Sequence, residues 1–141
     1  MQKSLNGLLL VAALAVPSAA VADDLTGQQH FLCTPVLVNV CSDDGKCESA
    51  TPWDLNIPQF LEFNLKDKVI STTKASNENR STPIRTLLNE NGHIYLQGVE
   101  AGRAFSFVIE EKTGLASIAV ARDDRTVSVF GGCTPIVSAA K

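Results

Sequence analysis

Three polar side chains, His93, Tyr95 and Gln97, stand at alternate positions of one short segment and are candidates for contacting a ligand. An imidazole, a phenol and an amide together supply hydrogen-bond donors and acceptors. Residues two apart point to the same face of a β-strand. If that face lines a cavity, these groups, with Arg85 on a neighbouring strand, would orient a small ligand. If it faces solvent, they form an ordinary hydrated face, and the apolar residues between them favour this outward orientation.

Trp53, the only tryptophan, is a further candidate contact. It follows Pro52, which favours a short helical turn at this point in the chain. Tryptophan combines a large apolar surface with one N–H donor, so it serves either in packing or in contacts with a ligand or partner. The predicted ligand-binding residues are therefore His93, Tyr95, Gln97, Trp53 and Arg85.

The sequence lacks the motifs that mark many enzymes. It contains no Gly-x-Ser-x-Gly, no His-Glu-x-x-His and no phosphate-binding loop. His30 and His93 are the only histidines, and the cysteines match neither a Cys-x-x-Cys redox motif nor zinc-ligand spacing. We expect no catalytic activity, no cofactor and no metal ion.

Residues 1–22 have the features of a bacterial signal peptide. Lys3 is followed by a short apolar run, residues 8–16, and then by the small residues Ala20-Val21-Ala22. The apolar run is far below the roughly 20 residues that span a bilayer, which favours a cleaved signal over a membrane anchor. We expect a mature chain that begins at Asp23, lies in the periplasm or is secreted, and carries no membrane anchor.

The remaining residues, 23–141, are enough for one domain. The net charge of −3 gives no electrostatic reason to bind nucleic acid. We expect a monomer whose partner is a small molecule or an envelope protein.

The four cysteines, Cys33, Cys41, Cys47 and Cys133, all lie in the expected mature chain. In an oxidising compartment an even number predicts two disulfides, for which three connectivities exist. Cys41 and Cys47 flank a turn-rich loop, so the simplest pairing joins them across a hairpin and leaves Cys33 for Cys133. That pairing would bring the first and last strands together.

The alternation of apolar residues predicts strands throughout the expected domain. In the last third, strands at 93–98, 104–110, 115–121 and 126–130 are separated by tight turns, the first of them Asn91-Gly92. Connections this short allow only antiparallel neighbours. This region is therefore predicted to be an antiparallel meander.

The first half adds an opening strand at 31–40, with Val36, Val38 and Val40 on one face and Pro35 at an edge or bulge. Further strands are expected after Cys47 and at 60–65, 69–72 and 84–88, whereas the polar segment 73–82 is expected to be the longest loop. The sequence thus predicts an all-β fold, an antiparallel meander of about eight or nine strands forming a small disulfide-stapled barrel or sandwich.

Three segments carry a resemblance: Phe31-Leu32-Cys33, Tyr95-Leu96-Gln97-Gly98 and Phe130-Gly131-Gly132-Cys133. With them the chain resembles small exported bacterial β-proteins of unknown function. In size and in having cysteines at both ends it is also similar to small-barrel periplasmic lysozyme inhibitors, although their Ser-Gly inhibitory loop motif is not recognisable. We expect an exported, non-catalytic binding module for a small, partly apolar ligand. The alternative is a protein-binding inhibitor of an envelope or host hydrolase that acts through the 73–82 loop or the Trp53 loop.

Overall fold

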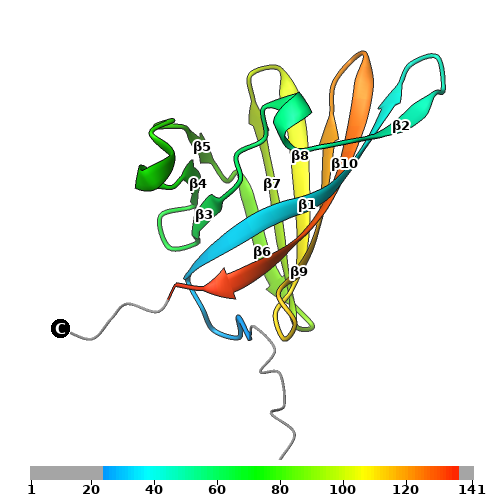
Figure 1. The fold of residues 1–141 in the computed structure, drawn as a ribbon. Coiled ribbons are helices and arrows are strands. Elements are labelled where there is room, and N and C mark those ends of the chain that lie inside the picture. Colours follow the sequence, from blue (N-terminus) through cyan, green and yellow to red (C-terminus); the bar gives the residue numbers. More distant parts are fainter. Residues whose placement is uncertain (1–23, 137–141) are drawn as a thin grey trace, which may run out of the picture.

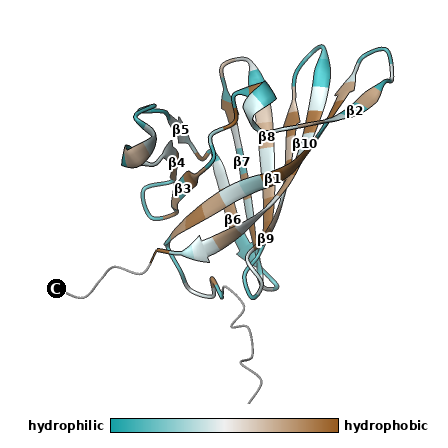
Figure 2. Cartoon of the chain, viewed as in Figure 1, coloured by the Kyte–Doolittle hydropathy of each residue, from teal (hydrophilic) through white to brown (hydrophobic). Residues whose placement is uncertain are grey.

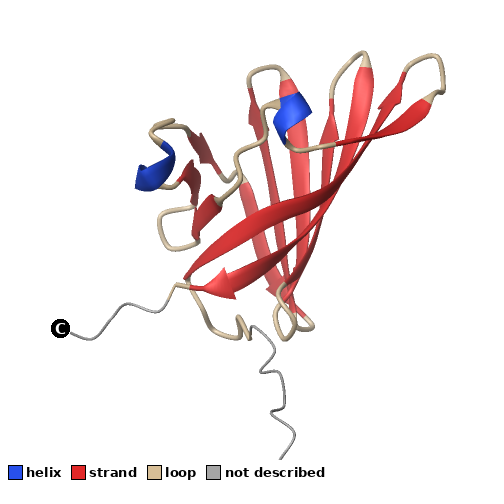
Figure 3. Ribbon diagram, viewed as in Figure 1, coloured by secondary structure: helices blue, strands red, loops and turns tan. Residues whose placement is uncertain are grey.

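The computed structural model describes residues 24–136, so the expected signal peptide lies outside the described residues. Strands make up most of this part, and its helical elements are two short 3₁₀ turns (Figures 1 and 3). The strands are β1 (His30–Ser42), β2 (Cys47–Ala50), β3 (Leu61–Asn64), β4 (Val69–Thr72), β5 (Ser81–Pro83), β6 (Thr86–Glu90), β7 (His93–Glu100), β8 (Arg103–Glu110), β9 (Leu115–Ala121) and β10 (Arg125–Pro135). The 3₁₀ turns are η1 (Trp53–Leu55) and η2 (Lys74–Ser76). No helix among these residues is long and apolar enough to cross a membrane.

The strands form one antiparallel sheet that curls into a half-barrel, which confirms the expected all-β class (Figure 1). The order across the sheet is β5-β4-β3-β1-β10-β9-β8-β7-β6, and β2 is added on β1. The two end strands, β5 and β6, are neighbours in the chain, separated by Ile84 and Arg85. The Ile84 N–H donates to Lys68 O beside β4, and the Arg85 N–H donates to Gln97 O in β7. This one stretch of chain therefore links the two ends of the sheet.

The expected meander is confirmed as β6 to β10, and its first two hairpins are closed by residues with positive φ. Asn91 and Gly92 have φ of 52° and 75°, and Ala101 and Gly102 have φ of 47° and 75°. Two successive positive φ values are what a two-residue type I′ turn requires. The polar turns and the more apolar middle of the long strands are visible in Figure 2.

Strand β1 organises the sheet because it pairs with β10 along its length, with β3 near its start and with β2 near its end. Its pairing with β10 shifts register between Pro35 and Leu37, the bulge position that the proline indicated. A bulge adds a residue and interrupts the alternation of faces. Val38 and Val40 are buried as expected, but Val36 is exposed, so the prediction that all three valines share a face was wrong for Val36.

The polar segment 73–82 was expected to be one long loop, but only part of it is a loop. It contains η2 and the beginning of β5, which pairs with β4 through Ser81, Thr82 and Pro83. Ser81, Thr82 and Pro83 show no alternation of apolar and polar residues, so the sequence pattern did not predict this strand. With β2 and β5 included, the described residues hold ten strands.

Both disulfides have the predicted connectivity. Cys33 is bonded to Cys133 between β1 and β10, and Cys41 is bonded to Cys47 between β1 and β2. In each case the two cysteines are direct cross-strand partners with Cα atoms 4.0 Å apart. Disulfides of this kind are typical of proteins in oxidising compartments outside the cytosol.

Phenylalanine rings form the centre of the core. Phe31 stacks on Phe63 with ring centroids 5.1 Å apart, and Phe63 meets the edge of Phe107 at 5.3 Å. Phe107 in turn meets Phe105 edge-on at 5.8 Å. Phe31 and Phe63 are completely buried, whereas Phe105 is only partly buried. The row of rings therefore leads from the closed part of the core to an open part of the inner face.

Candidate ligand-binding cavity

The open part of the inner face is a cavity of about 140 Å³. Its walls come from the short strands β3 and β4 on one side and from β8, β9 and β10 on the other. The apolar side chains that these strands contribute are Leu61, Ile70, Phe105, Phe107, Ile118, Val120 and Val129. The cavity thus has an apolar interior that continues the phenylalanine core.

Strand register explains why these side chains face the same space. Phe105 is paired with Val120, Phe107 with Ile118, and Ile118 with Val129. Directly paired residues of antiparallel strands project from the same face of a sheet. Alternation along β8 and β9 then places every second residue toward the cavity.

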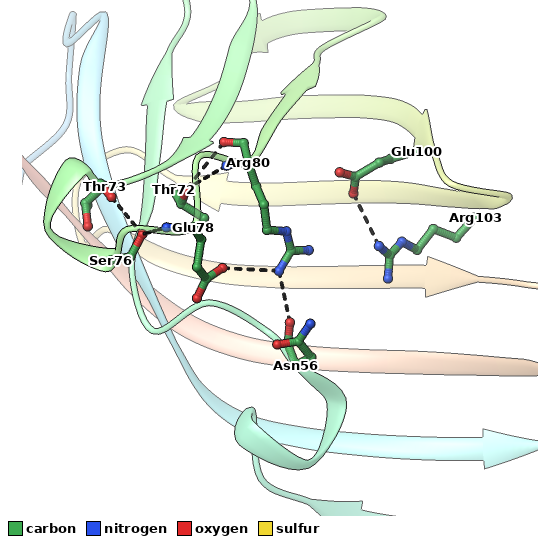
Figure 4. Close-up of polar contacts among 8 residues, drawn as sticks. All are labelled: Asn56, Thr72, Thr73, Ser76, Glu78, Arg80, Glu100 and Arg103. Atoms are coloured by element: carbon green, nitrogen blue, oxygen red, sulfur yellow. Dashed lines mark hydrogen bonds and ion pairs between the residues drawn. The ribbon is translucent and has the colours of Figure 1, made fainter.

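Partly exposed charged side chains mark the mouth of the cavity, and Figure 4 shows their polar contacts. Arg80, Glu100 and Arg103 line it together with residues 55–58, the segment that ends η1 and continues beyond it. The two arginine side chains are 32% and 34% exposed, so each guanidinium has access to both solvent and the cavity. The lining therefore carries two positive charges and one negative charge.

Arg80 is held at the mouth through its backbone and through one end of its side chain. Its N–H donates to Thr72 Oγ1 at 3.0 Å, and its carbonyl accepts from the Thr72 N–H at 3.0 Å. Its Nη1 donates to Asn56 O at 3.1 Å and lies 3.5 Å from Glu78 Oε2. These bonds connect the segment before β5 to the η1 segment on the other side of the mouth.

Arg103 and Glu100 flank the tight turn between β7 and β8 and are cross-strand partners. By the alternation that places Phe105 inside, both side chains lie on the inner face, at the end of its apolar row. Their charged groups are 3.6 Å apart. Exposed ion pairs at such a distance contribute little stability, so this contact constrains the guanidinium only weakly.

The residues predicted from the sequence lie away from this cavity. His93, Tyr95 and Gln97 stand on the outer face of β7, the orientation that their apolar neighbours favoured, with the His93 and Tyr95 ring centroids 6.0 Å apart. Arg85 and Gln97 help to line a second depression, of about 470 Å³ and more open to solvent than the cavity. Trp53 is 67% exposed in η1, two residues from the lining residue Leu55. The structure brings Arg85 and Gln97 together, and a binding role for the five residues stays a prediction.

The charged residues at the mouth of the cavity were not predicted from the sequence. Arg103 and Glu100 carried a usable signal, because each continues the inward alternation of its strand: Arg103 precedes Phe105 by two residues and Glu100 follows Gly98 by two. Arg80 carried none, since it lies in a polar segment without periodicity. Only the fold brings that segment to the mouth.

The lining also contains polar groups without charge. Its hydroxyl groups are those of Ser71, Thr72 and Thr82, and among the described lining residues there is no histidine, cysteine or lysine to activate them. No group of three or more His, Cys, Asp or Glu side chains within residues 24–136 is arranged to hold a metal ion.

Comparison of the chain with models of known protein families gives no match, and comparison with curated proteins gives none either.

Proposed function

We propose that the protein is an exported binding protein that holds a small, partly apolar ligand in the cavity of its half-barrel. The observation that carries this proposal is the cavity of about 140 Å³ with largely apolar walls, a few hydroxyl groups and the charged side chains of Arg80, Glu100 and Arg103 in its lining. An apolar cavity of roughly 150 Å³ is large enough to take up a benzene-sized molecule. Concave sites with apolar walls and a few polar groups that fix orientation are the usual form of small-molecule sites.

Export is part of the same proposal. Residues 1–22 would direct the chain out of the cytoplasm and be removed, leaving a periplasmic or secreted domain. The two disulfides support this location, because they persist in oxidising compartments. Mass spectrometry of the protein purified from its native host tests it: we expect a chain that begins at Asp23 and is four hydrogens lighter than its reduced form.

Filling the cavity tests the binding function. Val120 lines the cavity, whereas Val108 lies on the outer face of the neighbouring strand. Val120→Phe should abolish the NMR shifts that a single-ring ligand causes at cavity residues, and Val108→Phe, which adds the same ring outside, should leave them unchanged. The proposal fails if no single-ring compound shifts the cavity residues of the wild-type protein, or if Val120→Phe binds as the wild type does.

A protein-binding role is the second candidate, and the exposure of Trp53 favours it. Exposed tryptophans are frequent centres of protein–protein contacts. In this case the protein would inhibit a hydrolase such as lysozyme, and Trp53→Ala would remove the inhibition without unfolding the domain. Wild-type protein that leaves lysozyme fully active, or a Trp53→Ala variant that still inhibits it, would count against this role.

A further inference from the structure

We propose that the cavity selects ligands that carry a carboxylate, held at the mouth by the guanidinium groups of Arg80 and Arg103. This inference rests on the proposed function and specifies its ligand class: a small apolar tail, of about the size of one ring, joined by a short linker to a carboxylate.

The distribution of polar atoms limits where a ligand's polar head can lie. The walls contributed by β8, β9 and β10 are apolar, so a charged group placed among them would lose its hydration without compensation. At the mouth, the same inner face ends in Arg103, two residues along β8 from Phe105. A ligand whose tail contacts Phe105 and Phe107 therefore has its head within the region of the arginine.

The second arginine approaches the mouth from another part of the sheet. Arg80 is fixed by its backbone bonds to Thr72, and its side chain reaches across to Asn56 O (Figure 4). Among the described residues, the bonds that hold this guanidinium run through Nη1, which leaves Nε and Nη2 to point elsewhere. A guanidinium presents its donors in a planar fork that matches the two oxygens of a carboxylate.

The carboxylates at the mouth form only weak ion pairs with the two guanidinium groups. Glu100 and Glu78 lie 3.6 and 3.5 Å from Arg103 and Arg80, longer than a good charge-assisted hydrogen bond. All four side chains are between 32% and 39% exposed, where solvent screens such pairs. A ligand carboxylate can therefore replace Glu100 as the partner of Arg103, and Glu100 opposes that anion through like charge.

A matched ligand series separates recognition of the carboxylate from filling of the cavity. We choose 3-phenylpropionate, 3-phenylpropan-1-ol and 3-phenylpropylamine, which share the ring and the linker and differ in the head group. Their dissociation constants are measured by NMR titration at low ionic strength in a buffer free of carboxylate and phosphate. For the wild type we expect the carboxylate to bind at least tenfold more tightly than the alcohol, and the amine to bind most weakly.

Variants at the mouth assign this preference to named groups. Arg103→Gln and Arg80→Gln should each reduce the ratio of carboxylate to alcohol affinity several-fold, because a guanidinium binds a carboxylate more strongly than a neutral hydroxyl. Arg103→Lys should retain part of the preference for the carboxylate. Glu100→Gln should strengthen carboxylate binding alone. Lys112→Gln removes one positive charge in the turn after β8, at the opposite end of that strand from Arg103 and in the lining of neither depression, and should change none of these values.

The outcomes distinguish this inference from the function on which it rests. If the alcohol binds in the wild-type cavity as tightly as the carboxylate, the ligand class is wrong and the binding function stands. If none of the three compounds shifts the cavity residues, both fail. If the carboxylate is preferred but Arg80→Gln and Arg103→Gln both leave that preference intact, the assignment to Arg80 and Arg103 is overturned.

Discussion

The ring of Phe105 lies across Gly98, its partner on the neighbouring strand, and leaves no room for a side chain there. A Cβ on residue 98 would overlap the ring at Cζ and lie 2.9 Å from the carbonyl oxygen of Pro83. Phe105 also lines the cavity. The absence of a side chain at Gly98 therefore sets the position of one cavity wall.

Gly98→Ala should move this wall. The ring has to turn away from the new methyl group, and overpacking of this kind costs about 1–3 kcal/mol of unfolding free energy. We expect that loss in urea unfolding, together with weaker binding of single-ring ligands. Phe105→Leu introduced together with Gly98→Ala should restore part of the stability that Gly98→Ala removes. If the two changes in unfolding free energy simply add, the contact between residue 98 and the Phe105 ring is contradicted.

The adjacent glycines of β10 offer a matched pair. A Cβ on Gly131 would overlap the backbone oxygen of Thr34 beside the β1 bulge, whereas a Cβ on Gly132 would meet no atom within 4 Å. The backbone of Thr34 cannot shift to make room for a new Cβ as a flexible side chain can. Gly131→Ala should therefore destabilise the fold by about 2–3 kcal/mol, and Gly132→Ala should change stability by less than about 1 kcal/mol. Chemical denaturation of both variants checks this, and equal losses would show that the close approach at Gly131 has no effect.

The two disulfides should contribute unequally to stability. The Cys33–Cys133 bond joins residues 100 apart and the Cys41–Cys47 bond joins residues 6 apart. Loop-closure entropy gives about 4.7 kcal/mol for the long loop and about 2 kcal/mol for the short one. Unfolding of the Cys33→Ala/Cys133→Ala and Cys41→Ala/Cys47→Ala double variants measures both contributions. A larger loss from the Cys41–Cys47 pair would contradict this order.

The features that could be predicted from the sequence are those set by local rules. Alternation identified the meander because each strand of β7 to β10 has one buried face. The turn at Asn91-Gly92 followed from the positive φ that these residues adopt readily. The disulfides followed from placing Cys41 and Cys47 on one hairpin.

The features that escaped prediction depend on contacts between distant segments. Strand β5 exists because Ser81 and its neighbours pair with β4, and Thr82 is its only residue of a type enriched in strands. Val36 faces outward because the bulge near Pro35 adds a residue to the alternation. Arg80 reaches the cavity through pairing with Thr72, eight residues earlier in the chain, which periodicity does not encode.

The turn that carries Trp53 should loosen in acid. The carboxylate of Asp54 accepts hydrogen bonds from the Thr51 hydroxyl at 2.7 Å and the Thr51 N–H at 3.0 Å. These bonds favour the charged form and hold the pKa of Asp54 below its ordinary value. The unfolded turn therefore binds the proton more readily, so the stabilisation is present above the ordinary aspartate pKa of about 3.9 and is lost as pH falls through the lower pKa of the folded state.

Titration of the Asp54 carboxyl by NMR checks the direction of this shift, and Trp53 fluorescence reports the adjacent change in the turn. Thr51→Val removes the hydroxyl donor, which lowers this pKa more than the Thr51 N–H does, so the pKa of Asp54 should rise toward its ordinary value in that variant. Asp54→Asn keeps an oxygen that accepts from the Thr51 N–H but cannot titrate in this range. Its Trp53 signal should therefore stay constant through the acid range in which the wild-type signal changes, and an identical acid response in the two proteins would assign the change to another carboxyl group.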